Sequence, residues 1–301
     1  FLIEQRIDVV NTHSGVDSWI GGLAAKWART PVLLRTRHLN LPLKRSPLNF
    51  VHQLPDRIIT CGEAIRAELI SRDRFPAGQL VSIPTGIDFE SFKPQHGRSA
   101  TRKNLGLAES DFVILMVGIL RTVKGHDIAL RAFQAISSEL SQARLVLAGD
   151  GPWQAELERL AGTLRVTDRV RFLGFRDDVP DLMAAADMLL LTSRSEGVPQ
   201  AVTQAMHAGL PVVAARVGGV PELITHEQNG LLVASEDPAA TAAAARRIIQ
   251  EPNLARRFAA AGRVHVETRF NLKTMLDRTE QLCTRLLAER RRGSRPTLLR
   301  I

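Results

Sequence analysis

Short apolar segments alternate with helix-like segments along the chain, and this alternation constrains the fold more than any other feature of the sequence. The apolar segments are rich in Val, Ile and Leu and do not alternate strictly with polar residues, which is typical of strands buried on both faces of a parallel sheet. The segments expected to be strands are residues 7–10, 31–37, 57–60, 80–84, 112–120, 143–149, 170–174, 188–192, 211–214 and 229–233.

Helix-like patterns lie between these strands. In residues 125–140 the apolar residues Phe133, Ile136 and Leu140 recur at the spacing that places them on one helix face. The other expected helices are 154–161, 180–186, 199–207, 238–250 and 272–292. Pro199 occupies a plausible first helical position, and Gly209 follows the end of that helix. Repeated strand–helix units predict an α/β fold with doubly wound parallel sheets.

A polar segment with Pro and Gly and no periodicity, residues 92–99, indicates a boundary between two domains. A length of 301 residues also favours two domains. We therefore expect a Rossmann-like domain over residues 1–94, a linker over 95–105 and a second domain over 106–270. A helix over 271–292 is expected to pack back toward the first domain, ahead of a basic tail over 293–301. Because the chain starts at Phe1 and is expected to enter a strand at residue 7, we expect the first domain to be incomplete.

Positive charge is concentrated in two parts of the chain, which carries a formal net charge of +9. The C-terminal group is Arg290, Arg291, Arg292, Arg295 and Arg300. Residues 18–50 contain Lys26, Arg29, Arg35, Arg37, Lys44 and Arg45 and no acid. Such clusters attract phosphates, nucleic acid or an anionic membrane surface, although a solvated face or tail remains the alternative. The lack of Tyr, of an aromatic RNA platform and of a zinc finger argues against nucleic acid.

The composition also limits the cellular setting. The two cysteines, Cys61 and Cys283, can form neither a disulfide framework nor a zinc site. A reducing, cytoplasmic location is therefore expected. The longest uncharged apolar run, residues 112–120, is too short to cross a bilayer.

The loops that follow the strands are the expected place for chemistry, because ligands bind beyond the carboxyl ends of parallel strands. In the second domain these loops include residues 121–125, 150–152, 175–176, 193–197 and 216–219. Glycine-rich loops and helix N-termini bind phosphate without a metal. Lys124 and Arg121 can neutralise a diphosphate. Glu196 would be repelled by phosphate, so we expect it to bond the hydroxyl groups of a sugar.

Several of these loops carry recognisable motifs. Residues 193–214, SRSEGVPQAVTQAMHAGLPVVA, and 218–224, GGVPELI, resemble the signature of glycosyltransferase family 4. Val117-Gly118 together with Lys124-Gly125-His126 resembles the phosphate-binding segment of that family. Residues 147–152, LAGDGP, and 83–88, IPTGID, are similar to further family patterns. The resemblance extends to about residue 290.

The resemblance implies a GT-B fold, in which two Rossmann-like domains face each other with the active site in the cleft. It also implies retaining, metal-independent transfer of a sugar from a nucleotide-sugar donor, with no cofactor. Lys124 would hold the donor diphosphate, and Glu196, the first acid of the family's E-x7-E pattern, would contact the donor sugar. His38 would face the transferred sugar from the first domain.

Further donor contacts follow from the same resemblance. The backbone of Gly197, Val198 and Pro199 would cap the phosphates with a helix N-terminus. Phe175 and Arg176 would border the base, and Gly151 would lie in a donor-binding loop.

Three departures from the family pattern affect the expected donor site. The second acid of E-x7-E is replaced by Gln204, which can bond ribose hydroxyls but offers no charge. The Arg that often follows the glycine matching Gly118 is Ile119, for which Arg121 is the expected substitute. The glycine-rich loop expected near the family's N-terminus is missing, so the chain is expected to bind donor weakly or not to turn over.

Alternative functions stay open from the sequence. A nicotinamide-dependent oxidoreductase is disfavoured because Gly149 and Gly151 are followed by Gln154 where a third glycine is needed. A non-hydrolysing sugar-nucleotide epimerase of GT-B fold would need several cleft carboxylates, and a weakened carbohydrate-binding homologue is the third alternative. The expected partners are a nucleotide sugar, a glycan or lipid-linked acceptor of the envelope or lipopolysaccharide kind, and an anionic membrane at its periphery.

Overall fold

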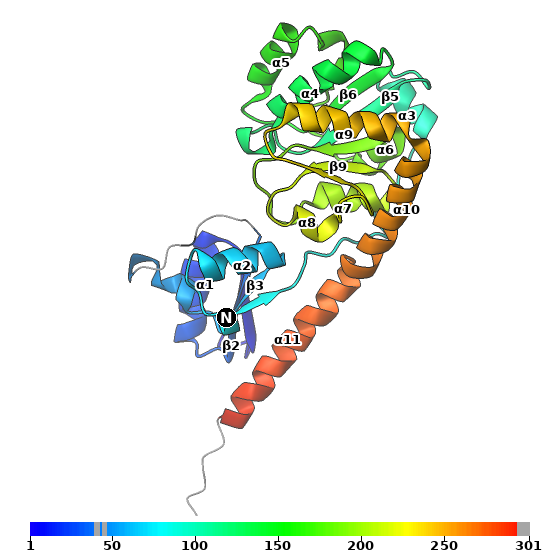
Figure 1. Cartoon of the computed structure of the whole chain (residues 1–301). Helices are drawn as coiled ribbons and strands as arrows, with labels where there is room; N and C mark the ends of the chain where they lie inside the picture. The colour runs from blue at the N-terminus through cyan, green and yellow to red at the C-terminus, as the bar shows by residue number, and fades with distance from the viewer. Residues whose placement is uncertain (39–42, 44–46, 294–301) are drawn as a thin grey trace, which may run out of the picture. The chain divides into compact units, whose positions relative to one another are not determined.

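The chain divides into two compact units in a computed structural model that describes residues 1–38, 43 and 47–293. The first unit contains Phe1–Gly86 and the segment from Leu272 onward, and the second contains Ile87–Asn271. Each unit is built on its own parallel sheet (Figure 1). The predicted α/β fold with parallel sheets is confirmed. In the part of the chain that the structure describes, no helix combines the length and apolar character needed to cross a membrane.

The first unit holds a four-stranded parallel sheet with strands in chain order. The strands are β1 (Val9–Thr12), β2 (Val32–Arg37), β3 (Arg57–Thr60) and β4 (Leu80–Ser82). The helices are α1 (Gly15–Trp27), α2 (Glu63–Ser71) and α11 (Leu272–Gly293), with 3-10 turns η1 (Pro47–Gln53) and η2 (Ala77–Gln79). Leu282 and Leu286 of α11 pack with Leu34 and Ile59 of the sheet, so the last helix contributes to this core.

The second unit holds a six-stranded parallel sheet in the order β10-β9-β8-β5-β6-β7, the doubly wound dinucleotide-fold order. The strands are β5 (Phe112–Val117), β6 (Ala143–Ala148), β7 (Val170–Phe172), β8 (Met188–Leu191), β9 (Val212–Ala215) and β10 (Leu231–Val233). The α-helices are α3 (Arg98–Asn104), α4 (His126–Glu139), α5 (Gln154–Thr163), α6 (Val179–Ala185), α7 (Gln200–His207), α8 (Val220–Leu223), α9 (Pro238–Gln250) and α10 (Pro252–Arg269), with 3-10 turns η3 (Thr122–Lys124) and η4 (Thr167–Arg169). Two buried clusters, one including α4, α5 and α9 and the other α6, α7 and α8, cover the two faces of the sheet.

The division between the units lies earlier than the sequence analysis placed it. The first unit ends at Gly86 and not at residue 94, and the expected linker 95–105 contains α3. Arg102 of α3 is fully buried; its guanidinium donates to the carbonyl oxygens of Ala185, Ala108 and Asp111, among others, and to Asp187. Most of the polar segment 92–99 precedes α3 and lies inside the second unit, where His96 bonds Asp181. The helix that follows is anchored by the buried, paired Arg102.

Candidate functional site

The strand order changes direction between β5 and β8, which are neighbours in the sheet although β6 and β7 lie between them in the chain. At such a switch point the loops leaving the two strands diverge and open a place for a ligand. Residues 118–125 follow β5 and residues 192–199 follow β8. Lys124 lies at the end of the first loop and Glu196 in the second.

These two predicted site residues meet in the structure. The Nζ atom of Lys124 lies 2.7 Å from Oε1 of Glu196. The Glu196 side chain is 8% exposed and that of Lys124 27% exposed, so the acid is buried while the lysine is only partly covered. A buried carboxylate requires such a partner, because an unpaired charge in this position would be strongly destabilising.

Both groups keep bonding capacity for a ligand. Oε1 of Glu196 also accepts a hydrogen bond from the Ser193 hydroxyl, at 2.6 Å. Oε2 accepts none from the described residues, and the Lys124 ammonium, which has three N–H donors, uses one on Glu196. The arrangement therefore presents a carboxylate oxygen for hydroxyl groups beside N–H donors for anionic oxygens.

The β8 loop makes close backbone approaches to the loops after β5 and β9. Gly125 has a φ of 65°, and a Cβ there would lie 2.1 Å from the carbonyl oxygen of Thr192. Gly218, in the loop after β9, has a φ of 49°, and a Cβ there would lie 1.9 Å from the carbonyl oxygen of Glu196. Any side chain at either position would force the loops apart.

The helix that follows Glu196 starts slightly later than predicted. Pro199 is the N-cap of α7 and not its first helical residue, and no side chain caps this end of the helix. Gly197 and Val198 are half-buried and lead into the helix, and the carbonyl oxygen of Gly197 accepts a hydrogen bond from Gly219 N, at 2.8 Å. Gln204, one turn further on, is half-buried. The donor-binding roles of these residues stay predictions.

The remaining residues predicted to contact the donor differ in their exposure and in their contacts with the rest of the protein. The Arg121 side chain is exposed and makes no ion pair with a described residue, and Phe175 is 75% exposed. Gly151 lies against the β5 loop, because a Cβ at this position would come 2.5 Å from the carbonyl oxygen of Leu120. Arg176 is paired with Asp178, and the hydrogen bond between them raises the pKa of Arg176.

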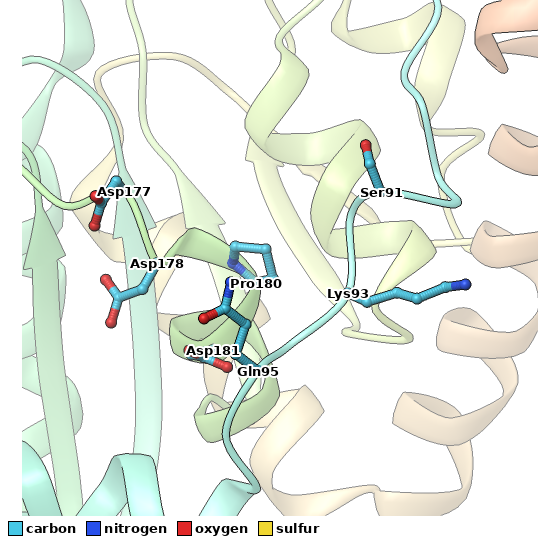
Figure 2. A pocket seen from close by; sticks show the side chains of 7 residues that line it. All are labelled: Ser91, Lys93, Gln95, Asp177, Asp178, Pro180 and Asp181. Carbon is cyan, nitrogen blue, oxygen red and sulfur yellow. The ribbon is translucent and has the colours of Figure 1, made fainter.

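A polar pocket of the second unit includes Asp177 and Asp178, the two residues that follow Arg176 in the chain (Figure 2). Its lining residues are Ser91, Lys93, Gln95, Asp177, Asp178, Pro180 and Asp181. Two of its three acids already have protein partners: Asp178 pairs with Arg176, and Asp181 accepts hydrogen bonds from His96 N, at 2.8 Å, and Nδ1, at 2.9 Å. Asp178 thus stabilises the segment that follows β7, and Asp181 joins α6 to the segment 91–96. Among the described residues, no group of three or more His, Cys, Asp or Glu side chains is arranged to hold a metal.

His38 belongs to the first unit, where it follows β2. Its Nε2 lies 3.0 Å from Nδ1 of His13, and the two rings stack with centroids 5.3 Å apart. Burial, together with the charge that His13 carries when protonated, lowers the pKa of His38. The neutral form of the His38 imidazole is therefore favoured. The predicted role of His38 toward a transferred sugar stays a prediction.

Two residues near Lys124 that the sequence analysis named only as members of motifs, with no role of their own, are prominent in the structure. Arg194 pairs with Asp127 and Glu236. His126, the first residue of α4, is 2% exposed, and its Nδ1 has no hydrogen-bond partner. Burial, and then the charge of Lys124, lowers the pKa of His126 to about 4. Neither environment can be read from spacing along the chain.

Comparison with known proteins identifies the family. The family described as Glycosyl transferases group 1 matches residues 97–265, more than half of the chain. The chain belongs to this family. Residues 1–91 match the family described as Glycosyltransferase Family 4, so the resemblance seen in the sequence is confirmed.

Among curated relatives, D-inositol 3-phosphate glycosyltransferase of Streptomyces scabiei (strain 87.22) is 30% identical over 312 residues, covering 95% of this chain and 69% of that protein. The UDP-Gal:alpha-D-GlcNAc-diphosphoundecaprenol alpha-1,3-galactosyltransferase of Escherichia coli is 28% identical over 251 residues, covering 78% of this chain and 65% of that protein. Among solved structures, Anabaena Alr3699/HepE in complex with UDP and glucose has a TM-score of 0.85 at 26% identity, covering 94% of this chain and 80% of that one. The structural neighbours confirm the GT-B fold class for this group 1 glycosyltransferase.

Acid should destabilise the protein partly through His126. The unfolded chain binds a proton at this residue near the ordinary pKa of about 6.5, whereas the folded chain does so near 4, so stability falls as pH drops between these values. Between pH 6.5 and 5 the loss amounts to about 1.6 kcal/mol at this one site. Urea unfolding of the wild type and of His126→Asn at both pH values should show a smaller loss in the variant. Equal losses in both proteins would show that His126 does not titrate in this way.

Proposed function

We propose that this chain is a retaining, metal-independent glycosyltransferase that moves a sugar from a nucleotide-sugar donor to a glycan or lipid-linked acceptor. The observation that carries the proposal is the 2.7 Å pair of Lys124 and Glu196 at the switch point of the second unit's sheet. Lys124 is suited to bind phosphate and Glu196 to bind hydroxyl groups. A nucleotide sugar carries phosphate and hydroxyl groups close together, so it matches this pair. The UDP and glucose bound by Alr3699/HepE, a protein of similar structure, are the parts of such a donor.

In this proposal Lys124 stabilises the leaving nucleoside diphosphate. Negative charge develops on the leaving group as the bond to the sugar breaks, and donors already aimed at that position lower the barrier. The two N–H groups of Lys124 that do not bond Glu196 are available for phosphate oxygens. The backbone N–H groups at the start of α7, which no side chain caps, supply further donors.

Glu196 binds and positions the donor sugar and is not a nucleophile. Its Oε1 accepts two hydrogen bonds, from Lys124 and Ser193, which fix the carboxylate while Oε2 stays available for sugar hydroxyls. It is the one acid in residues 118–125 and 192–199. A double displacement needs a closely spaced pair of carboxylates, so substitution on one face of the sugar without a protein nucleophile fits these loops better.

The α1 helix of the first unit supports contact with an anionic membrane at the cytoplasmic face. Its small residues Ser18, Gly22 and Ala25 are buried, whereas Val16, Ile20, Leu23 and Trp27 form an exposed stripe along the helix. Lys26 and Arg29 are exposed at its C-terminal end. An exposed apolar helix face with basic residues beside it is suited to the surface of an anionic bilayer, where a lipid-linked acceptor is embedded.

A vesicle-binding measurement tests the membrane contact. The wild type should bind vesicles that contain phosphatidylglycerol and not vesicles of phosphatidylcholine alone, and Ile20→Glu should weaken binding about tenfold because it places a charge in the apolar stripe. Val264→Glu, at an exposed apolar residue of α10, is the matched control and should bind like the wild type. Equal binding by Ile20→Glu, or wild-type protein that self-associates instead of binding vesicles, would contradict the proposal.

Removal of the Lys124 ammonium tests the donor site. We expect Lys124→Met to weaken binding of UDP, or of whichever nucleoside diphosphate among UDP, GDP and ADP binds the wild type best, about 10- to 100-fold, the loss typical of a hydrogen bond between charged groups. The affinity is measured by isothermal titration calorimetry. Lys103→Met, at an exposed lysine of α3, is the control and should keep wild-type affinity. If Lys124→Met binds as well as the wild type, Lys124 does not hold the diphosphate.

A further inference from the structure

Arg194 connects three loops at the carboxyl edge of the second unit's sheet. Its Nη1 donates to the carbonyl oxygen of Thr122, at 2.5 Å, and to Oδ1 of Asp127, at 3.0 Å. Its Nη2 donates to Oδ2 of Asp127, at 2.8 Å, and its Nε to Oε1 of Glu236, at 3.0 Å. The backbone N–H of Arg194 also donates to the carbonyl oxygen of Val123, at 2.8 Å. One residue of the β8 loop thus holds the β5 loop and the loop after β10.

The contacts with the β5 loop fall on the residues around Lys124. Thr122 and Val123 precede Lys124 in the turn η3. Asp127 follows Lys124 by three residues and lies in the first turn of α4. Arg194 therefore bonds the chain on both sides of the lysine, and its guanidinium hydrogen bonds go to Thr122, Asp127 and Glu236. The turn that carries the ammonium is fixed to the same loop that carries Glu196.

The electrostatics of the contact are those of a strong, partly buried ion pair. The hydrogen bond to Asp127 raises the pKa of Arg194 above its ordinary value. Burial on its own would raise the pKa of Asp127, but the hydrogen bonds and charge of Arg194, together with backbone hydrogen bonds at the start of α4, outweigh it and the pKa is lowered. Glu236 is a further sign of constraint, because it has a φ of 60°, a left-handed conformation that non-glycine residues seldom adopt.

We propose that Arg194 is a positioning residue that acts through Lys124: it fixes the turn 122–124 so that the ammonium is directed both at Glu196 and at the donor diphosphate. This inference rests on the proposed function. The planar guanidinium bonds a carboxylate with two parallel N–H groups and still reaches a carbonyl oxygen and a second acid, which an ammonium cannot do in one geometry.

A double-mutant cycle separates this role from a merely structural one. UDP affinity, or that of the nucleoside diphosphate found to bind best, is measured by calorimetry for the wild type, Arg194→Ala, Lys124→Met and the double variant. We expect Arg194→Ala to weaken binding about tenfold in the wild-type background and less than about twofold in the Lys124→Met background. Arg194→Lys, which keeps the charge but loses the fork, should stay close to Arg194→Ala.

Arg247 provides the matched control. It is likewise paired with two acids, Glu227 and Glu251, but these lie before β10 and after α9, at the opposite edge of the sheet. Arg247→Ala should lower the melting temperature without changing nucleotide affinity. Melting curves of each variant show whether it is folded, and Arg194→Lys serves for the cycle should Arg194→Ala fail to fold.

The possible results distinguish the two proposals. If no nucleoside diphosphate binds the wild type, or if Lys124→Met binds normally, the proposed donor site is wrong and the role of Arg194 falls with it. Suppose that Lys124→Met binds the nucleoside diphosphate weakly. If the Arg194 variants then bind like the wild type, or if Arg194→Ala lowers the affinity by the same factor in both backgrounds, only the positioning role is overturned. If Arg194→Lys binds with wild-type affinity, the charge of the side chain at this position is sufficient, and the proposed role of the guanidinium geometry is wrong.

Discussion

The close approach of the β5 and β8 loops is the constraint on which the rest of the site depends. Strands β5 and β8 are neighbours in the sheet, and a glycine at 125 lets the β5 loop lie against the carbonyl oxygen of Thr192. This contact brings the ammonium of Lys124 to the carboxylate of Glu196. Because the carboxylate is buried, its charge needs a nearby cation, and the pair still keeps donor and acceptor positions that are not used within the described residues.

Much of the fold could be predicted from the sequence because parallel strands buried on both faces leave a strong apolar signal. All ten expected strands are present, with ends that differ by up to three residues. Helix α1 was not predicted, because its large apolar residues lie on the exposed face and small residues on the buried one. The segment 95–105 was predicted to be a linker because the polar residues 92–99 include Pro and Gly, whereas in the structure His96 bonds Asp181 and the buried Arg102 anchors α3 to the second unit.

The candidate site shows where sequence reasoning stops. Lys124 and Glu196 could be placed together because a general rule of parallel sheets locates the loops that carry them. Arg194 and His126 could not be given a role, since their significance lies in a hydrogen-bond geometry and in a burial that only the folded chain defines. Their positions suggest that the neighbourhood of Lys124 is ordered before any ligand binds, which lowers the cost of orienting a donor.

The measurement that tests this account most directly is the difference in affinity between UDP-glucose and UDP, which is the affinity that the sugar contributes. Calorimetry of the wild type and of Glu196→Gln, each with UDP-glucose and with UDP, isolates that gain, because the amide oxygen can still accept the hydrogen bonds from Lys124 and Ser193. The account predicts that the sugar increases affinity in the wild type and that this increment falls about tenfold in Glu196→Gln, while the affinity for UDP changes little. An unchanged increment in the variant would contradict the assignment of Glu196 to the sugar and, with it, the account of the paired site.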